Sequence, residues 1–119
     1  MARPAENETW LIEAGDRVIE QEAHSSLGSL TTWERVVYSL WVADYGMRNA
    51  GDLDTAKDVF ADFQSMALRS AEELSLSLTQ EAFSMEPGTL EVEYFERFDA
   101  ICDEIRNAEP NAEANRPRG

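Results

Sequence analysis

Apolar residues recur at spacings of three and four from Trp10 to Ile105, which is the period of an amphipathic helix, and no segment alternates as a strand would. The first helical pattern runs from Thr9 to about His24 and is weakened by Gly15. A second pattern starts at the capping-box sequence Thr31-Thr-Trp-Glu34 and ends near Asn49-Ala50-Gly51. We therefore expect two helices over these ranges.

The middle of the chain carries a long helical pattern whose internal division is open. Apolar positions continue from Leu53 to Leu78, and Asp52 is a suitable N-cap. A second capping-box sequence, Ser70-Ala-Glu-Glu73, lies inside this stretch. The pattern thus predicts either one long helix or two helices that break near Arg69, followed by a short helix from Thr79 to Met85.

The last apolar stripe is the clearest in the chain. It runs from Leu90 to Ile105, after a turn predicted at Pro87-Gly88. The sequence that follows contains two prolines and no large apolar residue, which is typical of disorder. We predict an all-α fold: a single compact bundle of about five helices over residues 9–107, with a flexible N-terminus at 1–8 and a disordered tail at 108–119.

Composition and charge limit the functions that the chain can have. With 119 residues and 43% hydrophobic residues, it can bury the core of one domain. The 24 acidic and 10 basic residues give a net charge of −14, which excludes unaided binding to nucleic acid or anionic lipid. We expect a basic protein as partner. With one cysteine, no signal peptide and no apolar run long enough for a membrane span, the sequence predicts a cytoplasmic protein.

Catalytic and metal-binding motifs are missing from the sequence. His24 at a predicted helix end suits a cation that favours the helix dipole, and Gln21 stands where a Glu-x-x-His metal motif needs glutamate. The acids from Asp52 to Asp58 lack the glycine and final glutamate of a calcium loop. Burial and nearby acids should raise the pKa of Cys102, as in an inert core thiol. We expect the protein to be no enzyme and to bind no cofactor or metal. Among the function classes considered, an enzyme with a hidden carboxylate site ranks last.

Acidic residues concentrate in the C-terminal half. The segment between Gly51 and Ile105 contains fourteen acidic and three basic residues, which gives it a net charge of −11. The acids predicted to bind the partner are Asp54, Asp58, Asp62, Glu72, Glu73, Glu91, Glu93, Glu96, Asp99 and Asp103.

Two predicted rows of these carboxylates carry the functional argument: Asp54, Asp58 and Asp62, and then Glu96, Asp99 and Asp103. Carboxylates three or four residues apart repel each other, which destabilises a helix by a few tenths of a kcal/mol per pair. DNA presents a phosphate about every 3.4 Å along each strand, and such rows offer a basic protein a comparable field. The alternative is an acidic surface that only favours solubility.

The segment WERVVYSLWVADYGMRNAGD resembles the centre of a family of small acidic helical bacterial proteins that includes a DNA mimic. Glu34 and Tyr38 match the family's Glu-x-x-x-Tyr pattern, and Asp44 matches an acid near the end of the same helix. Residues 49–52 correspond to the family's Asn-Gly-Gly-Phe turn, in which alanine and aspartate here replace glycine and phenylalanine.

The later sequence YFERFDAICDEI resembles the family's final helix, whereas Gly46 stands where the family usually has an acid. The resemblance implies an all-helical, self-associating protein and, for its characterised member, capture of a DNA-binding transcription factor. Trp33, Trp41 and the last stripe also supply more apolar surface than a small bundle needs, so a homodimer is expected.

Two functions are consistent with these features. The first is a non-enzymatic DNA mimic that occupies the basic DNA-binding surface of a transcription factor or nucleoid protein. The alternative is an immunity-type protein that neutralises a cationic toxin.

Asp44 lies on the apolar face of its predicted helix, so it should lie at the core margin or hydrogen-bond a nearby loop.

Overall fold

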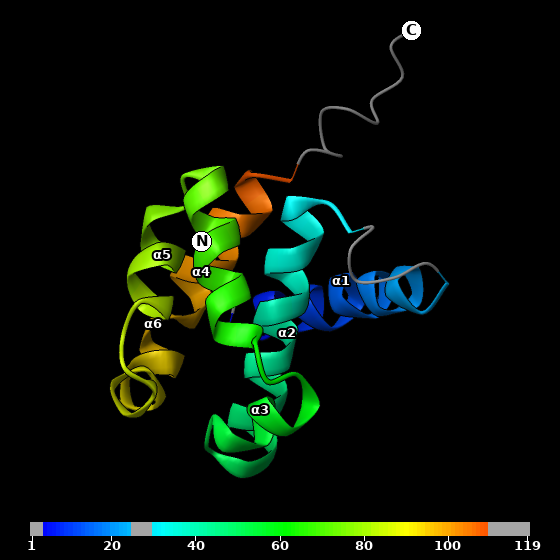
Figure 1. Ribbon diagram of the computed structural model, residues 1–119. Coiled ribbons are helices and arrows are strands. Elements are labelled where there is room, and N and C mark those ends of the chain that lie inside the picture. Colours follow the sequence, from blue (N-terminus) through cyan, green and yellow to red (C-terminus); the bar gives the residue numbers. More distant parts are fainter. Residues whose placement is uncertain (1–3, 25–29, 110–119) are drawn as a thin grey trace, which may run out of the picture.

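The computed structural model describes residues 4–24 and 30–109, and within them every regular element is an α-helix (Figure 1). The helices are α1 (Pro4–His24), α2 (Thr32–Ala50), α3 (Asp54–Val59), α4 (Phe63–Leu74), α5 (Ser77–Phe83) and α6 (Pro87–Asn107). The predicted all-α class is therefore confirmed. The disorder expected at residues 110–119 lies outside the described part of the chain.

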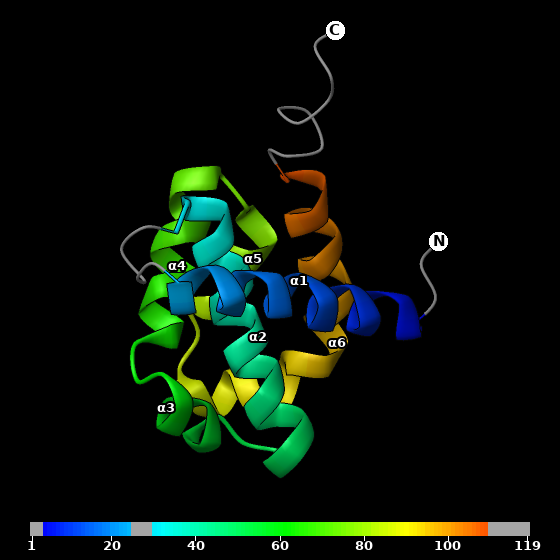
Figure 2. The same cartoon turned by 90° about the vertical axis from the view of Figure 1, so that its right-hand side faces the viewer.

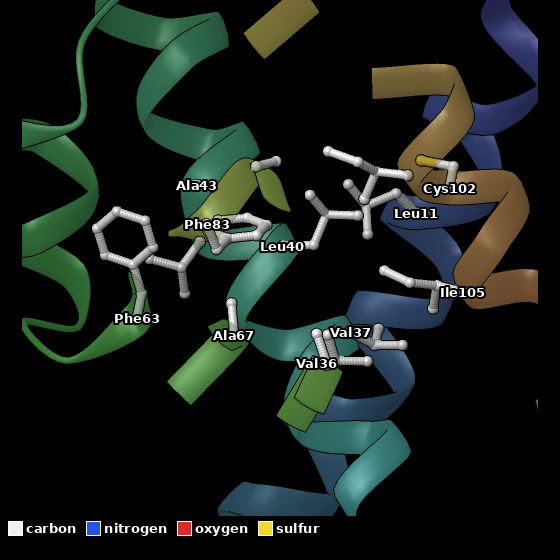
Figure 3. Packing of buried hydrophobic residues seen from close by; sticks show 14 of the residues in the cluster. Leu11, Val36, Val37, Leu40, Ala43, Phe63, Ala67, Phe83, Cys102 and Ile105 are labelled. Carbon is white, nitrogen blue, oxygen red and sulfur yellow. The ribbon is translucent and has the colours of Figure 1, made fainter. Parts of the chain in front are cut away.

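Helix α2 is the central element of the fold. It contacts α1, α3, α4 and α6, and Figure 2 shows α1 crossing in front of both α2 and α6. Its buried residues point in several directions, as expected for a helix enclosed by others. Figure 3 shows Val36, Val37, Leu40 and Ala43 of α2 between two groups of apolar side chains. One group is Phe63, Ala67 and Phe83 from α4 and α5, and the other is Leu11, Cys102 and Ile105 from α1 and α6.

The two ends of α2 follow from local sequence, as predicted. Thr31 Oγ1 accepts a hydrogen bond from the Glu34 N–H at 3.1 Å, and Glu34 Oε1 accepts one from the Thr31 N–H at 2.8 Å. At the other end Gly51 adopts a left-handed conformation (φ 75°) and donates its N–H to the carbonyl oxygens of Gly46 and Met47. Glycine adopts this conformation without a Cβ clash.

Helices α1 and α6 differ from the predicted boundaries at their ends. Helix α1 begins at Pro4, so residues 4–8, expected in a flexible N-terminus, are helical, and the Asn7 side chain is buried. Pro87 and Gly88 are not a turn but the first two residues of α6. Proline suits this position because the first N–H groups of a helix have no intrahelical acceptor. Ala108, assigned to the tail, packs against the core.

The break in the middle of the chain lies elsewhere than predicted. Helix α3 ends at Val59, α4 begins at Phe63, and Ser70 to Glu73 lie inside α4, so a single long helix and a break near Arg69 are both wrong. Phe60 is extended (φ −154°), and its ring lies 5.4 Å from that of Tyr38. This contact between distant residues favours a break that the local capping pattern does not indicate.

Gly15 permits the close crossing of α1 and α2 and supplies a stability test. A Cβ at Gly15 would overlap Cδ1 of the Trp41 ring and lie 2.7 Å from its Cγ, whereas a Cβ at Gly88 would meet nothing within 4 Å. We expect Gly15→Ala to lower the free energy of unfolding by about 1–3 kcal/mol through overpacking. Gly88→Ala should raise it by up to about 1 kcal/mol, because alanine favours helix. Urea unfolding measures both, and a stabilising Gly15→Ala would contradict the close crossing.

Candidate partner-binding surface

The ten acids predicted to bind a partner divide into two groups of five in the structure. One group bonds to other residues of the fold: Glu73, Glu91, Glu93, Asp99 and Asp103. The carboxylates of the other group make no hydrogen bond or ion pair with a described residue: Asp54, Asp58, Asp62, Glu72 and Glu96. All five in this second group are exposed.

Asp99 and Asp103 hold α1 against α6. Asn7 is fully buried, and its Nδ2 donates to Asp99 Oδ1 at 3.0 Å and to Asp103 Oδ1 at 3.2 Å. Arg106 donates to Asn7 Oδ1 at 2.8 Å, and its guanidinium lies 5.5 Å from the centre of the Trp10 ring. Since a buried amide needs hydrogen-bond partners, these two carboxylates stabilise the helix packing.

Two of the other three acids connect different elements, and the third forms a pair within α6. Glu91 Oε2 accepts the Leu53 N–H at 2.8 Å, just before α3. Glu73 accepts the Thr32 hydroxyl at 3.0 Å, and Glu93 binds Arg97 within α6 at 2.7 Å. Half of the predicted binding residues thus have a role in the fold.

Glu104 has a structural role that the sequence analysis missed. Its carboxylate accepts the N–H groups of Leu78 (2.9 Å) and Thr79 (2.7 Å) and the Thr79 hydroxyl (2.8 Å). It thereby caps α5 from α6, because the local N-cap, Leu76, has no side-chain acceptor. The lack of a capping residue before α5 was the only sequence signal for such a distant partner.

Asp44 lies in a buried polar cluster between α2 and α6. It accepts the Tyr94 hydroxyl at 2.7 Å and the Arg48 Nε–H at 2.9 and 3.0 Å. Its predicted hydrogen bond is present, but the Tyr94 partner comes from a helix rather than from a loop. Burial raises the pKa of Asp44, and burial together with the Asp44 carboxylate raises the pKa of Tyr94 well above its usual value.

Cys102 lies in the core, as predicted. It is fully buried, and burial, with additional effects from Asp44, Asp99 and Asp103, raises its pKa. A thiol that holds its proton is a poor nucleophile.

Within the described chain, no group of three or more His, Cys, Asp or Glu residues could hold a metal ion. None of the described helices combines the length and apolar character of a membrane span.

The predicted rows of carboxylates are interrupted. Because α3 ends at Val59, only Asp54 and Asp58 share one helix, and Asp62 precedes the start of α4. In the second row only Glu96 is free, since Asp99 and Asp103 bind Asn7. The structure therefore does not contain the continuous helical ladders that the spacing predicted.

The free carboxylates next to α3 gather at one end of the molecule. The hydrogen bond from Leu53 to Glu91 joins α3 to the first turns of α6, and both lie at the lower end in Figure 2. We call this region the acidic end, which consists of the free carboxylates of Asp54, Asp58, Asp62 and Glu86 together with two bonded ones, Asp52, which accepts the Thr55 N–H, and Glu91. Lys57 is the single cation on α3. Glu72 is not part of it, because it lies in the last turn of α4 beside a surface hollow of about 360 Å³.

The buried Asp44 predicts a specific pH dependence of stability. Burial raises its pKa above the value of 3.8 that an exposed Asp has, so the folded protein retains a proton that the unfolded chain releases. The free energy of unfolding of the parent, minus that of Asp44→Asn, should fall as pH rises from about 4 to about 7. Urea unfolding across this range measures the difference.

Asp54→Asn is the matched control, because Asp54 is exposed and its carboxylate has no partner among the described residues. This substitution removes no bond within the described fold, so it should change the free energy of unfolding little. A difference for Asp44→Asn that rises with pH would show that the bonds from Arg48 and Tyr94 outweigh burial.

Comparisons of the chain with protein-family models, with curated proteins and with solved structures find no match. The resemblance to the DNA-mimic family therefore stays a prediction. The basis for a functional proposal is the surface of the chain itself, above all the carboxylates that remain free at the acidic end.

Proposed function

We propose that this protein is a non-enzymatic binding protein that captures a basic protein through its acidic end and acts as a DNA mimic. The observation that carries the proposal is the set of exposed carboxylates at and after α3, Asp54, Asp58 and Asp62, which no described residue neutralises. The partner would be a DNA-binding protein whose lysines and arginines normally contact phosphates.

The free carboxylates are suited to such a partner because binding them breaks no bond within the fold. Asp54 and Asp58 are four residues apart on α3, which places their side chains about 5–6 Å apart. The hydrogen bond from Leu53 to Glu91 links α3 to α6, so the charges belong to a supported surface. A field of one sign also accelerates association with an oppositely charged partner.

The chain offers a control for charge alone, because α1 carries exposed acids as well. Glu13, Asp16 and Glu20 are exposed, and their side chains bond to no described residue. Replacing three acids on α1 or three at the acidic end changes the net charge by the same amount. A difference between these variants reports the position of the charge rather than its sum.

The test uses a purified nucleoid protein with a pI above about 9 as the basic probe. Its affinity for the parent should fall steeply between about 50 and about 200 mM salt, and a DNA duplex should compete for it. The variant D54N/D58N/D62N should bind several-fold more weakly at low salt. The variant E13Q/D16N/E20Q should bind like the parent.

Fluorescence anisotropy measures these affinities, and far-UV circular dichroism checks that each variant remains helical. Equal weakening by the two triple variants would show a response to net charge only. Undiminished binding by D54N/D58N/D62N would show that the acidic end is merely a solvated surface. Either result would refute the proposal.

A further inference from the structure

Two of the exposed large apolar side chains lie on α6 beside the acidic end. Val92 is 80% exposed and Phe95 is 50% exposed. Val92 directly follows Glu91, which is bonded to the Leu53 N–H before α3. An exposed valine alone is ordinary, but neighbouring apolar side chains next to a proposed binding surface are a candidate for partner contact.

These side chains continue the face of α6 that packs against α1. Val92 and Asp99 are seven residues apart, so they lie on nearly the same side of the helix. At Asp99 helix α1 lies against that side, because Asn7 of α1 bonds to the Asp99 carboxylate, although Asp99 itself stays exposed. Figure 2 shows α1 crossing α6 near its middle, with the first turns of α6 below the crossing.

Helix α2 reaches this part of α6 through Arg48. The Arg48 guanidinium lies 5.1 Å from the centre of the Phe95 ring, and Tyr45 precedes Arg48 by one helical turn. Tyr45 is 42% exposed and stacks on Trp41 with ring centres 5.8 Å apart. We call Tyr45, Val92 and Phe95, which come from two adjacent helices, the α2–α6 apolar surface.

The charges around this surface favour a basic occupant. Glu96 lies one turn beyond Val92 and makes no hydrogen bond or ion pair with a described residue, and Glu8 of α1 lies beside Arg48. Arg48 is the cation that contacts the surface, and it is already bound by Asp44 at 2.9 Å and by Glu8 at 3.8 Å. A second copy of the chain would bring the same carboxylates to the contact, where like charges repel.

The backbone of the surface determines the form of the occupant. The N–H and C=O groups of α2 and α6 are bonded within these helices, and the described chain has no strand edge to which an extended segment could add. A segment that satisfies its own backbone groups avoids this problem. An amphipathic helix does so and presents apolar side chains at spacings of three and four.

We infer that the α2–α6 apolar surface is the docking site for an amphipathic helix of the basic partner, whose apolar side chains contact Tyr45, Val92 and Phe95 while its lysines and arginines face the surrounding carboxylates. The inference rests on the proposed function, since it names the part of a basic protein that the acidic surface selects. Charge provides the attraction, and the apolar contact provides the selection among basic segments.

The test uses three synthetic probes: an amphipathic Leu/Lys helix of about 18 residues, its scrambled isomer and oligolysine of equal charge. Fluorescence anisotropy should show the parent binding the amphipathic peptide at least about ten-fold more tightly than the other two. Val92→Ser and Phe95→Ala should reduce that preference several-fold. Leu78→Ser is the matched control, because Leu78 is 44% exposed on α5, and it should leave the preference unchanged.

Each other outcome overturns the inference in a recognisable way. Equal, salt-sensitive binding of all three peptides would reject the apolar docking site and leave the proposed electrostatic capture intact. Binding of none would contradict both. Val92→Ser keeps the test valid if Phe95→Ala unfolds, because the Val92 side chain is mostly exposed. Light scattering that gives twice the 13.4 kDa chain mass, reduced to one chain by Val92→Glu, would assign the surface to a second copy.

Discussion

The packing of this fold depends on carboxylates of α6 that accept hydrogen bonds from other parts of the chain. Glu91 accepts an N–H just before α3, Glu104 caps α5, and Asp99 and Asp103 bind the buried Asn7 of α1. In a chain with a net charge of −14, bringing the helices together also brings like charges together, and donors that meet some of the carboxylates reduce this repulsion. Placing carboxylates where helices expose free N–H groups provides those donors.

These bonds orient the helices, while the apolar core supplies most of the free energy of folding. A hydrogen bond to a charged group and a fully buried large apolar side chain each contribute about 1.5–3 kcal/mol, and an exposed hydrogen bond contributes less. The apolar side chains dominate because they are more numerous. The core contains many such side chains around α2. The carboxylates decide which turn of α6 lies beside which helix, and so determine which parts of α6 stay uncovered.

The two proposals rest on the carboxylates and apolar side chains that remain exposed and unbonded after folding. Once half of the predicted binding acids are bonded within the molecule, the free charge is concentrated at specific places, chiefly around α3. Helix α1 crosses α6 near its middle, and on the first turns below the crossing Val92 and Phe95 remain exposed. Neither feature is evident from the net charge alone.

The sequence by itself determined the all-helical class, both ends of α2 and the place of Cys102 on a buried apolar stripe. Each depends on neighbours in the chain: the spacing of apolar residues, the Thr31–Glu34 capping box and the local apolar stripe. Only the tertiary structure decided the break after Val59, the packing role of Gly15 and the division of the acids into bonded and free. Asp99 and Asn7 are 92 residues apart, and a contact over that distance depends on how the helices pack, which local periodicity does not encode.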